Sequence, residues 1–323
     1  MVKKDIHKLL IPNPINNLSL FGYNKYFNSF LKLFENKNLP NSIMLSGLKG
    51  IGKATFIYHF VNYILSKNEK NKYDLKNFKI DKESDNLKLL KNNIHPNFFL
   101  LENENFSNEI KIEQVRKLQQ FLNTSTYLKD IKIILIDNAE FLNKNSINSL
   151  LKSIEEPTHN TFFFIIQNST SKISETLKSR CVNFKINFTL EEKKKIFKNI
   201  YSNLFTENIS EDLIDNFLLI DTPGNVIKYI LDLSESQSKN DLNYIYKYIN
   251  KYKDDKSSET LSFLLLFINN YYKSLLLNKK NNLNVYYNSH SKIIRYICDL
   301  KNFNLNSKSV LNSIQFILEN EAK

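Results

Sequence analysis

A cluster of glycines around residue 50 constrains this chain more than any other feature of its sequence. The chain has only five glycines, and three of them are Gly47, Gly50 and Gly52. Fixing a glycine costs backbone entropy, so such a cluster indicates a loop that needs unusual backbone angles or close approach by another group. A short apolar run, 42–46, precedes the loop, and apolar residues with helical spacing follow it over 56–65. The sequence therefore predicts a strand, a glycine loop and a helix in succession.

This order, with a lysine at the end of the loop, is typical of a phosphate-binding loop, or P-loop. In such a loop backbone N–H groups and the positive end of the helix surround an anion, and Lys53 would reach the terminal phosphates of a nucleotide. Ala54 stands where a serine or threonine normally ligates Mg²⁺, and Thr55 comes one place late. ATP or ADP is the expected ligand, with impaired coordination of Mg²⁺. The alternative interpretation is a chance glycine turn before a helix.

Composition indicates an ordinary globular protein. Apolar residues make up 42% of the chain and charged residues 24%, which is usual for a folded protein of two or three domains. No long apolar run follows the basic start, and the most apolar later segment, 261–268, is too short to cross a bilayer. Cys181 and Cys298 are too few for a disulfide framework or a four-cysteine zinc site. These features predict a cytoplasmic location, with no membrane as partner.

The net charge leaves direct contact with DNA open. A formal charge of +12 favours acidic partners, and nucleic acid is the obvious candidate. However, the lysines are spread along the chain rather than gathered in one stripe, so a composition rich in lysine and asparagine throughout explains the charge equally well.

Further strands and helices define the fold class. A helix is predicted from about Tyr23 to Glu35, and four more apolar segments are predicted as strands: 97–101, 131–136, 161–167 and 182–186. Five apolar strands alternating with helices predict an α/β domain with a mostly parallel sheet covered on both faces. The segment 66–94 is polar and is predicted to be a solvated insertion, mobile or loosely helical. From Thr189 onward only helical patterns remain, which predicts an all-α C-terminal region.

Polar residues at the ends of two predicted strands complete the candidate site. The strand 131–136 ends in Asp137, where a P-loop protein carries the acid that holds Mg²⁺ through water. Asn138 follows, although ATPases of this class usually have a glutamate there to polarise the attacking water. Glu140 is acidic but lies two residues further along. The candidate nucleotide-binding residues are Gly47, Gly50, Gly52, Lys53, Thr55, Asp137 and Asn168.

Four motifs, taken in chain order, resemble the bacterial clamp-loader subunits of DNA polymerase III, which belong to the AAA+ class of P-loop proteins. The motifs are the glycine loop 47–53, the strand end 133–137, the run 149–157 (Ser-Leu-Leu-Lys-Ser-Ile-Glu-Glu-Pro) and Ser179-Arg180-Cys181. The resemblance covers roughly residues 15 to 235, and the last two motifs are its most specific part. It implies an AAA+ domain over 1–187, a helical lid over 188–238 and a helical collar over 239–323 that joins such subunits into a ring.

The resemblance also implies a role for Arg180. In the family, the arginine of this motif reaches across the subunit boundary to the γ-phosphate of ATP bound next door. Arg180 would accordingly be a catalytic arginine finger acting in trans. Arginine suits this task because its planar guanidinium is permanently charged and donates in a fork. A surface arginine with a purely structural role is the alternative.

Departures from the family pattern favour one kind of subunit. The motifs occur in ATPase subunits of the gamma/tau kind and in a kind whose hydrolytic apparatus is weakened. Ala54 and Asn138 favour the second kind, as does Asn225, which stands where an ATP-sensing arginine is usual. The four cysteines of the family's zinc module are absent and the segment 66–94 takes their place, so no zinc or other resident metal is expected.

The implied partners are gamma/tau ATPase subunits and a delta subunit in a hetero-pentameric ring, with primed DNA reached through the complex. Two rival functions stay open. One is an active gamma-type ATPase in which Thr55 and Glu140 take over the displaced roles. The other is a DNA-binding or scaffold module that uses the fold without nucleotide.

Overall fold

The computed structural model describes residues 13–103, 109–124, 131–204, 211–234, 241–256, 258–278, 283–303 and 306–322. The chain divides into two compact units, Met1–Lys228 and Tyr229–Lys323. This division falls inside helix α9, Pro223–Ser234. The finer boundaries at 187 and 238 stay predictions.

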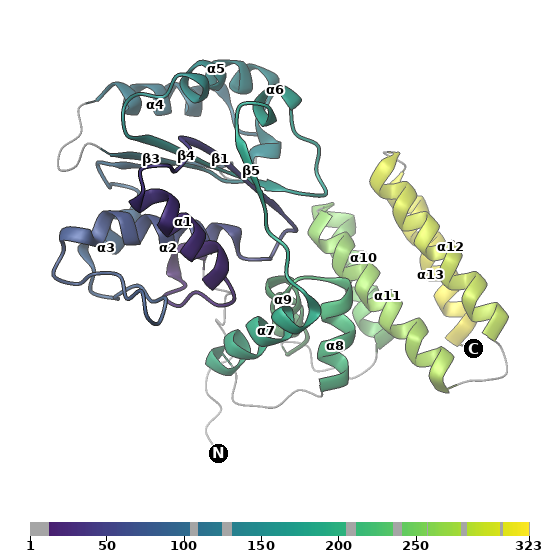
Figure 1. Cartoon of the computed structure of the whole chain (residues 1–323). Coiled ribbons are helices and arrows are strands. Elements are labelled where there is room, and N and C mark those ends of the chain that lie inside the picture. Colours follow the sequence, from purple (N-terminus) through teal and green to yellow (C-terminus); the bar gives the residue numbers. More distant parts are fainter. Residues whose placement is uncertain are drawn as a thin grey trace. The chain divides into compact units, whose positions relative to one another are not determined.

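A sheet of five parallel strands forms the centre of the first unit (Figure 1). The order across the sheet is β2-β3-β4-β1-β5. The strands are β1, Ser42–Gly47; β2, Phe98–Leu101; β3, Lys132–Ile136; β4, Thr161–Asn168; and β5, Val182–Lys185. Every residue of β1 and β3 is buried, as expected for inner strands of a parallel sheet with both faces covered. The predicted α/β fold is confirmed.

The last strand differs from the expectation of five apolar strands. β5 pairs only with β1, with Val182 opposite Ile43, so it is an edge of the sheet. Three of its four residues are exposed, and Val182 is 46% exposed. A short strand with polar residues is usual at an edge, because it discourages pairing with another chain.

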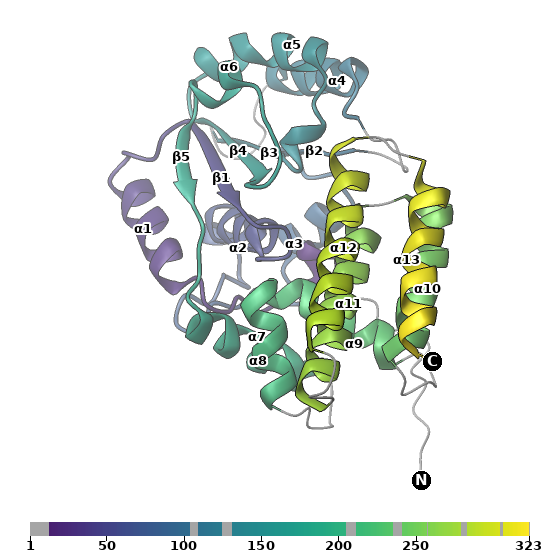
Figure 2. The ribbon, with the colours of Figure 1, turned by 90° about the vertical axis from the view of Figure 1, so that its right-hand side faces the viewer.

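Helices cover both faces of the sheet (Figures 1 and 2). One face carries α1, Asn24–Glu35, α2, Lys53–Leu65, and α3, Asp85–Lys91; the other carries α4, Ile112–Asn123, α5, Lys144–Glu155, and α6, Glu175–Lys178. Successive strand residues point to opposite faces. Thus Ile43 and Leu45 of β1 belong to the core under α1 and α2, whereas Met44 belongs to the core under α4 and α5.

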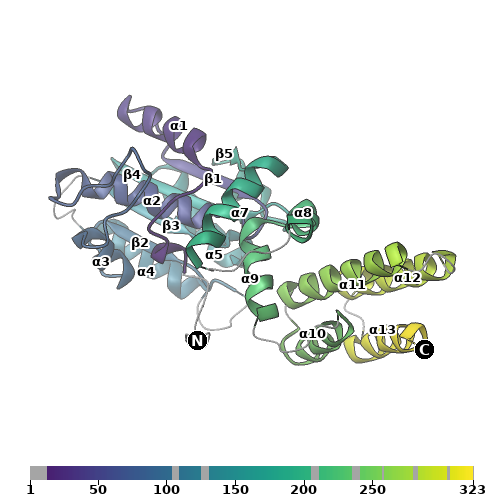
Figure 3. The same ribbon diagram turned by 90° about the horizontal axis from the view of Figure 1, so that it is seen from below.

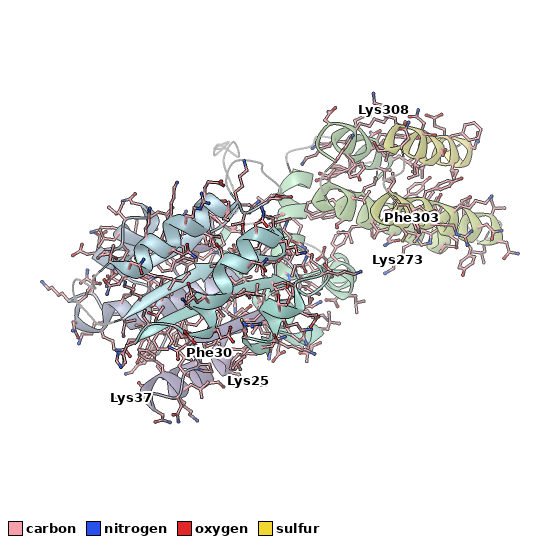
Figure 4. The ribbon with its side chains drawn as sticks, turned by 90° about the horizontal axis from the view of Figure 1, so that it is seen from above. Lys25, Phe30, Lys37, Lys273, Phe303 and Lys308 are labelled. Atoms are coloured by element: carbon pink, nitrogen blue, oxygen red, sulfur yellow. The ribbon has the colours of Figure 1, made fainter. Side chains whose placement is uncertain are left out.

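Aromatic side chains join α1 to α2. Phe30 is fully buried and makes edge-to-face contacts with Phe56 and Phe60, at ring-centroid distances of 5.1 and 5.4 Å. In Figure 4, Phe30 lies inward of α1, whereas Lys25 and Lys37 lie on the exposed side. The predicted helix from Tyr23 to Glu35 is therefore confirmed as α1, which is held by its apolar face.

The segment 66–94 is better packed than the solvated insertion that the sequence predicts, although it does contain a helix, α3. Tyr73, Ile80, Leu87 and Leu90 all lie in the core beneath α2. The backbone N–H of Ile80 donates to the carbonyl of Leu18 (2.9 Å), which ties the segment to the chain before α1. A few apolar residues among many polar ones are enough to anchor this segment, although they leave no clear period in the sequence.

Three helices complete the first unit and lead out of it: α7, Leu190–Leu204; α8, Glu211–Ile220; and α9. We call them the lid helices. The last of them begins at Pro223, because proline fits the first turn of a helix, where no backbone N–H is needed.

The second unit is entirely helical in its described part, as predicted. Its helices are α10, Asp241–Asp255; α11, Ser258–Asn278; α12, Leu283–Asn302; and α13, Ser307–Ala322 (Figure 3). Helix α11 packs against α10 and α12, and α13 packs against the same two helices. Phe267 is central to the core, within 5.3 Å of the rings of Tyr229, Tyr244 and Tyr248. Among the described helices, none combines the length and apolar character that crossing a bilayer demands.

Candidate functional site

A cavity of about 560 Å³ lies at the carboxyl end of β1. Its walls come from the segment before α1, the glycine loop, the ends of β3 and β4, helix α7 and the start of α9. This is where open parallel sheets bind their ligands. The predicted residues that line the cavity are Gly50, Gly52, Lys53, Thr55, Asp137 and Asn168. Gly47 ends β1 just before the loop, and Arg180 does not line the cavity.

The glycine loop has the backbone angles that its sequence predicts. Gly50 and Gly52 have positive φ values of 78° and 99°, and Gly52 is the N-cap of α2. Tyr23 supports the loop, because its hydroxyl donates a hydrogen bond to the carbonyl of Ile51 (3.1 Å). A Cβ on Gly52 would lie 3.3 Å from the Tyr23 ring. The N–H groups at the start of α2 are thus held beside the cavity.

Lys53 is buried within this loop. Its Nζ donates to the carbonyls of Gly47 (2.7 Å) and Leu48 (2.9 Å), and the residue is only 6% exposed. Burial lowers the pKa of Lys53 to about 8, while Asp137 and Glu140 act in the opposite direction. The ammonium group therefore stands ready for an anion, but it loses its proton more easily than an ordinary lysine.

Two acidic side chains lie near Lys53. Burial raises the pKa of Asp137, an effect opposed by the backbone N–H of Asn138, which donates to its Oδ1 (2.9 Å), and by Lys53. Glu140 Oε2 accepts a hydrogen bond from the backbone N–H of Asn168 (3.3 Å). The structure thus gathers the ends of β3 and β4 around the lysine, as the sequence predicts for parallel strands.

The hydroxyl of Thr55 is engaged elsewhere. It accepts a hydrogen bond from Asn17 Nδ2 (3.3 Å), and the carbonyl of Asn17 lies 2.8 Å from His59 Nε2. Burial lowers the pKa of His59 to about 4, so the ring is neutral and donates to that carbonyl. Asn17 therefore fixes the segment before α1 against α2. Sequence reasoning missed this residue, since asparagine is abundant throughout the chain.

The donor set does not fit the usual magnesium site of a P-loop. Ala54 offers no oxygen and the Thr55 hydroxyl is bonded to Asn17, so Asp137 is left without its usual partner ligand. Within the described ranges, no three His, Cys, Asp or Glu side chains gather as a metal site.

The start of α9 is bonded to the glycine loop. Thr222 Oγ1 donates to the carbonyl of Lys49 (2.8 Å), and the backbone N–H of Gly224 donates to the carbonyl of Gly50 (3.1 Å). Asn225 Nδ2 approaches the Lys49 carbonyl at 3.4 Å. A Cβ on Gly224 would lie 2.5 Å from Gly50 O, so only glycine fits there. We call these contacts the lid–loop clamp.

Arg180 lies at the other end of the sheet. It precedes β5, which runs parallel to β1 with Val182 opposite Ile43, whereas the glycine loop follows Gly47 at the far end of β1. The intervening strand length is roughly 15 Å at 3.3 Å per residue. Arg180 Nε donates to Glu155 Oε2 (3.0 Å) and Nη1 donates to the carbonyl of Thr176 (2.9 Å). Its side chain is 31% exposed, so it has access to solvent but not to the cavity.

A family model and several sequence relatives match this chain. A family model described as "DNA polymerase III, delta subunit" matches residues 22–189. The DNA polymerase III subunit delta' of Pseudomonas aeruginosa is 33% identical over 142 residues, which is 44% of this chain and 42% of that protein. The corresponding subunit of Escherichia coli is 26% identical over 141 residues, covering 44% and 40%.

Other matches are more distant or of another kind. The DNA polymerase III subunit gamma of Buchnera aphidicola is 29% identical over 136 residues, covering 41% of this chain and 37% of that protein. The chain thus spans less than half the length of these three relatives. Among solved structures, a gamma subunit-related protein of Thermotoga maritima has a TM-score of 0.42 at 15% identity, covering 90% of this chain and 97% of that one. The RuvB branch migration motor of the same organism also scores 0.42, covering 82% and 80%.

Proposed function

The chain belongs to the family of DNA polymerase III delta subunits, and from that membership we propose that it is a clamp-loader subunit of the delta-prime type. In this role it does not hydrolyse ATP. It supplies Arg180 to ATP held by a neighbouring ATPase subunit, while the complex loads the sliding clamp on primed DNA. Its partners are gamma/tau-type ATPase subunits and a delta subunit in a hetero-pentameric ring.

The position of Arg180 is the observation that carries this proposal. The guanidinium is partly exposed, and it lies at the opposite end of the sheet from the glycine loop of the same chain. It is therefore out of reach of a nucleotide in its own cavity, and a nucleotide that it touches must belong to another subunit. In phosphoryl transfer, an arginine supplied in this way is worth on the order of 10³ to 10⁵ in rate.

The weakened hydrolytic apparatus supports the same proposal. Ala54 and Asn138 lack the groups that ligate Mg²⁺ and polarise water in an active P-loop ATPase, and Thr55 is turned to Asn17. ATP or ADP is held by the N–H groups at the start of α2 and by Lys53, in the cavity that the segment before α1 also lines. Such a nucleotide has a structural role and is not consumed.

A reconstituted complex tests the proposal. The chain is mixed with the ATPase and delta subunits of its own organism, the clamp and primed DNA, and ATP hydrolysis is measured with the wild type and with Arg180→Ala. We expect Arg180→Ala to lower the stimulated rate severely, to a residual rate that can still be measured, while assembly persists by size-exclusion chromatography. Arg116→Ala is a matched control, because Arg116 lies on the exposed side of α4. Equal stimulation of ATP hydrolysis by the wild type and by Arg180→Ala would show that Arg180 does not act as an arginine finger.

The rival ATPase function rests on Glu140, which lies near Lys53 and Asp137. If Glu140 replaces the missing catalytic glutamate, the purified chain alone turns over ATP, and both Lys53→Ala and Glu140→Gln abolish that turnover. We expect no turnover by the chain alone. Steady hydrolysis that both substitutions remove would establish the rival in place of our proposal.

A further inference from the structure

The contacts of Arg180 with Glu155 and Thr176 fix the direction of its guanidinium. Arginine has five N–H donors. One, on Nε, donates to Glu155 Oε2 (3.0 Å), and one, on Nη1, donates to the Thr176 carbonyl (2.9 Å). Among the residues that the structure describes, no group accepts a hydrogen bond from the other three, which include both on Nη2. Two donors are thus engaged within the chain, and the side chain is 31% exposed, which leaves the other three donors for an external anion.

Glu155 occupies a place where a carboxylate is otherwise unfavourable. It is the last residue of α5, and the carbonyl end of a helix carries a partial negative charge that disfavours an acid. The charge of Arg180 compensates for this cost at the pair. Glu156, the next residue, is also exposed, but Arg180 does not donate to it.

The base that holds Glu155 is rigid. Ile154 is 2% exposed, and its carbonyl accepts a hydrogen bond from the buried hydroxyl of Ser42 in β1 (3.0 Å). The end of α5 is therefore fastened to the same sheet that carries Arg180. A glutamate on a backbone fixed in this way can restrict the rotamers of the arginine side chain that it binds, which would otherwise vary freely in solvent.

We propose that Glu155 is a positioning residue for the arginine finger. It holds Nε so that the Nη2 edge of Arg180 is presented across the subunit boundary to the terminal phosphate of a nucleotide bound next door. This inference rests on the proposed function. It adds a residue that does not touch the nucleotide but sets how often the guanidinium is correctly aimed.

The experiment is a double-mutant cycle in the reconstituted complex, with Glu155→Ala, Arg180→Ala and the double variant. An exposed pair of this kind typically shifts a side-chain population about two- to five-fold, so we expect Glu155→Ala to lower the stimulated kcat by about that factor. The KM for ATP should not change, because the finger acts in the transition state. In the Arg180→Ala background, Glu155→Ala should have no further effect.

Two variants separate positioning from a merely structural role. Glu155→Gln keeps an acceptor at the same place and should restore most of the rate, while Glu156→Ala should behave as wild type. An additive effect of Glu155→Ala in the double variant, or a faster rate from Glu155→Ala alone, would overturn the inference. So would a normal rate from Glu155→Ala while Arg180→Ala is defective, an outcome that leaves the proposed function intact. If Arg180→Ala itself has no effect, the proposed function and this inference fall together.

Discussion

At the scale of single residues, the buried ammonium of Lys53 makes nucleotide binding depend on pH. Its pKa of about 8 means that the free site loses its positive charge as pH rises through that value. Phosphate binding requires the charged form, so we expect affinity for ADP to fall up to about tenfold per pH unit above pH 8. Isothermal titration calorimetry with ADP between about pH 6.5 and about pH 9.5 measures this dependence.

Lys53→Arg is the control, since a guanidinium stays charged throughout and should give a flat profile of affinity against pH. If the wild-type profile is equally flat, the lysine stays charged over this range.

The same pKa shift affects the stability of the free protein. The folded pKa lies below the ordinary value of 10.5, so the unfolded chain binds more protons between pH 8 and 10.5. Stability should therefore rise with pH across that window as far as this group is concerned.

The sequence could identify the residues of the site that belong to the P-loop pattern, but not those that support it. Lys53 and Asp137 follow from spacing and strand ends, and the structure brings them together. Asn17 and Tyr23 act through long-range contacts with Thr55 and Ile51. Such contacts depend on how the segment before α1 folds back, and no local pattern encodes them.

At the scale of elements, Lys132 holds the end of helix α4. This lysine is 5% exposed, and its Nζ donates to the carbonyls of Phe121 (3.1 Å), Leu122 and Thr124. The last carbonyls of a helix have no partner within it, and a cation there also suits the helix dipole. Lys132→Met should cost about 1–3 kcal/mol, because buried acceptors lose their donor.

Urea unfolding followed by circular dichroism measures that loss. Lys117→Met, on the exposed face of the same helix, is the matched control and should change stability by less than about 0.5 kcal/mol. Equal midpoints for the two variants would mean that water replaces the lysine at no cost.

The lid–loop clamp makes a second prediction at this scale. In Gly224→Ala the new Cβ would lie 2.5 Å from the carbonyl oxygen of Gly50, so the start of α9 must move away from the loop. We expect a loss of about 1–3 kcal/mol, as for other overpacked sites. Hydrogen exchange should also become faster in residues 49–53.

Asn225→Ala serves as the comparison within the clamp, because it removes the 3.4 Å hydrogen bond to the Lys49 carbonyl and the 2.8 Å hydrogen bond to Asp221 Oδ1 but introduces no clash. It should leave exchange in the loop close to that of the wild type. If Gly224→Ala protects the loop as well as the native residue does, the clamp is not what orders it.

The elements themselves were largely predictable, and the exceptions have physical reasons. Inner strands such as β3 are continuous apolar runs, and α1 has a clear helical period, so both follow from pattern. β5 is an edge strand with exposed residues, so an apolar pattern describes it poorly. In 66–94 the apolar anchors are sparse, and their burial under α2 is a tertiary effect.

At the scale of the whole molecule, two units with separate cores should unfold separately. The core of the first unit lies on the two faces of the sheet, and that of the second surrounds Phe267. We expect calorimetry to show two transitions rather than one. ADP at about 100 times its Kd should increase the free energy of unfolding of the first unit by about 2.7 kcal/mol, and so raise the transition temperature of that unit only.

Phe267→Ala identifies the other transition. Loss of a buried phenylalanine costs about 3–5 kcal/mol, so it should lower the transition temperature of the second unit only. Lys53→Ala should remove the response to ADP. A single transition that both ADP and Phe267→Ala shift would mean that the two units melt as one cooperative body.

Parallel strands also give the first unit a polarity. The glycine loop lies at one end of the sheet and Arg180 lies at the opposite end. Subunits with two unlike ends can join head to tail, and such contacts close into a ring or extend as a row. Under the proposed function, each active junction in such an assembly needs a complete nucleotide site on one subunit and an arginine finger on the next. A subunit that supplies the arginine but has an incomplete site of its own would complete one junction and leave another inactive, so the sequence of one short loop would set how many junctions hydrolyse ATP.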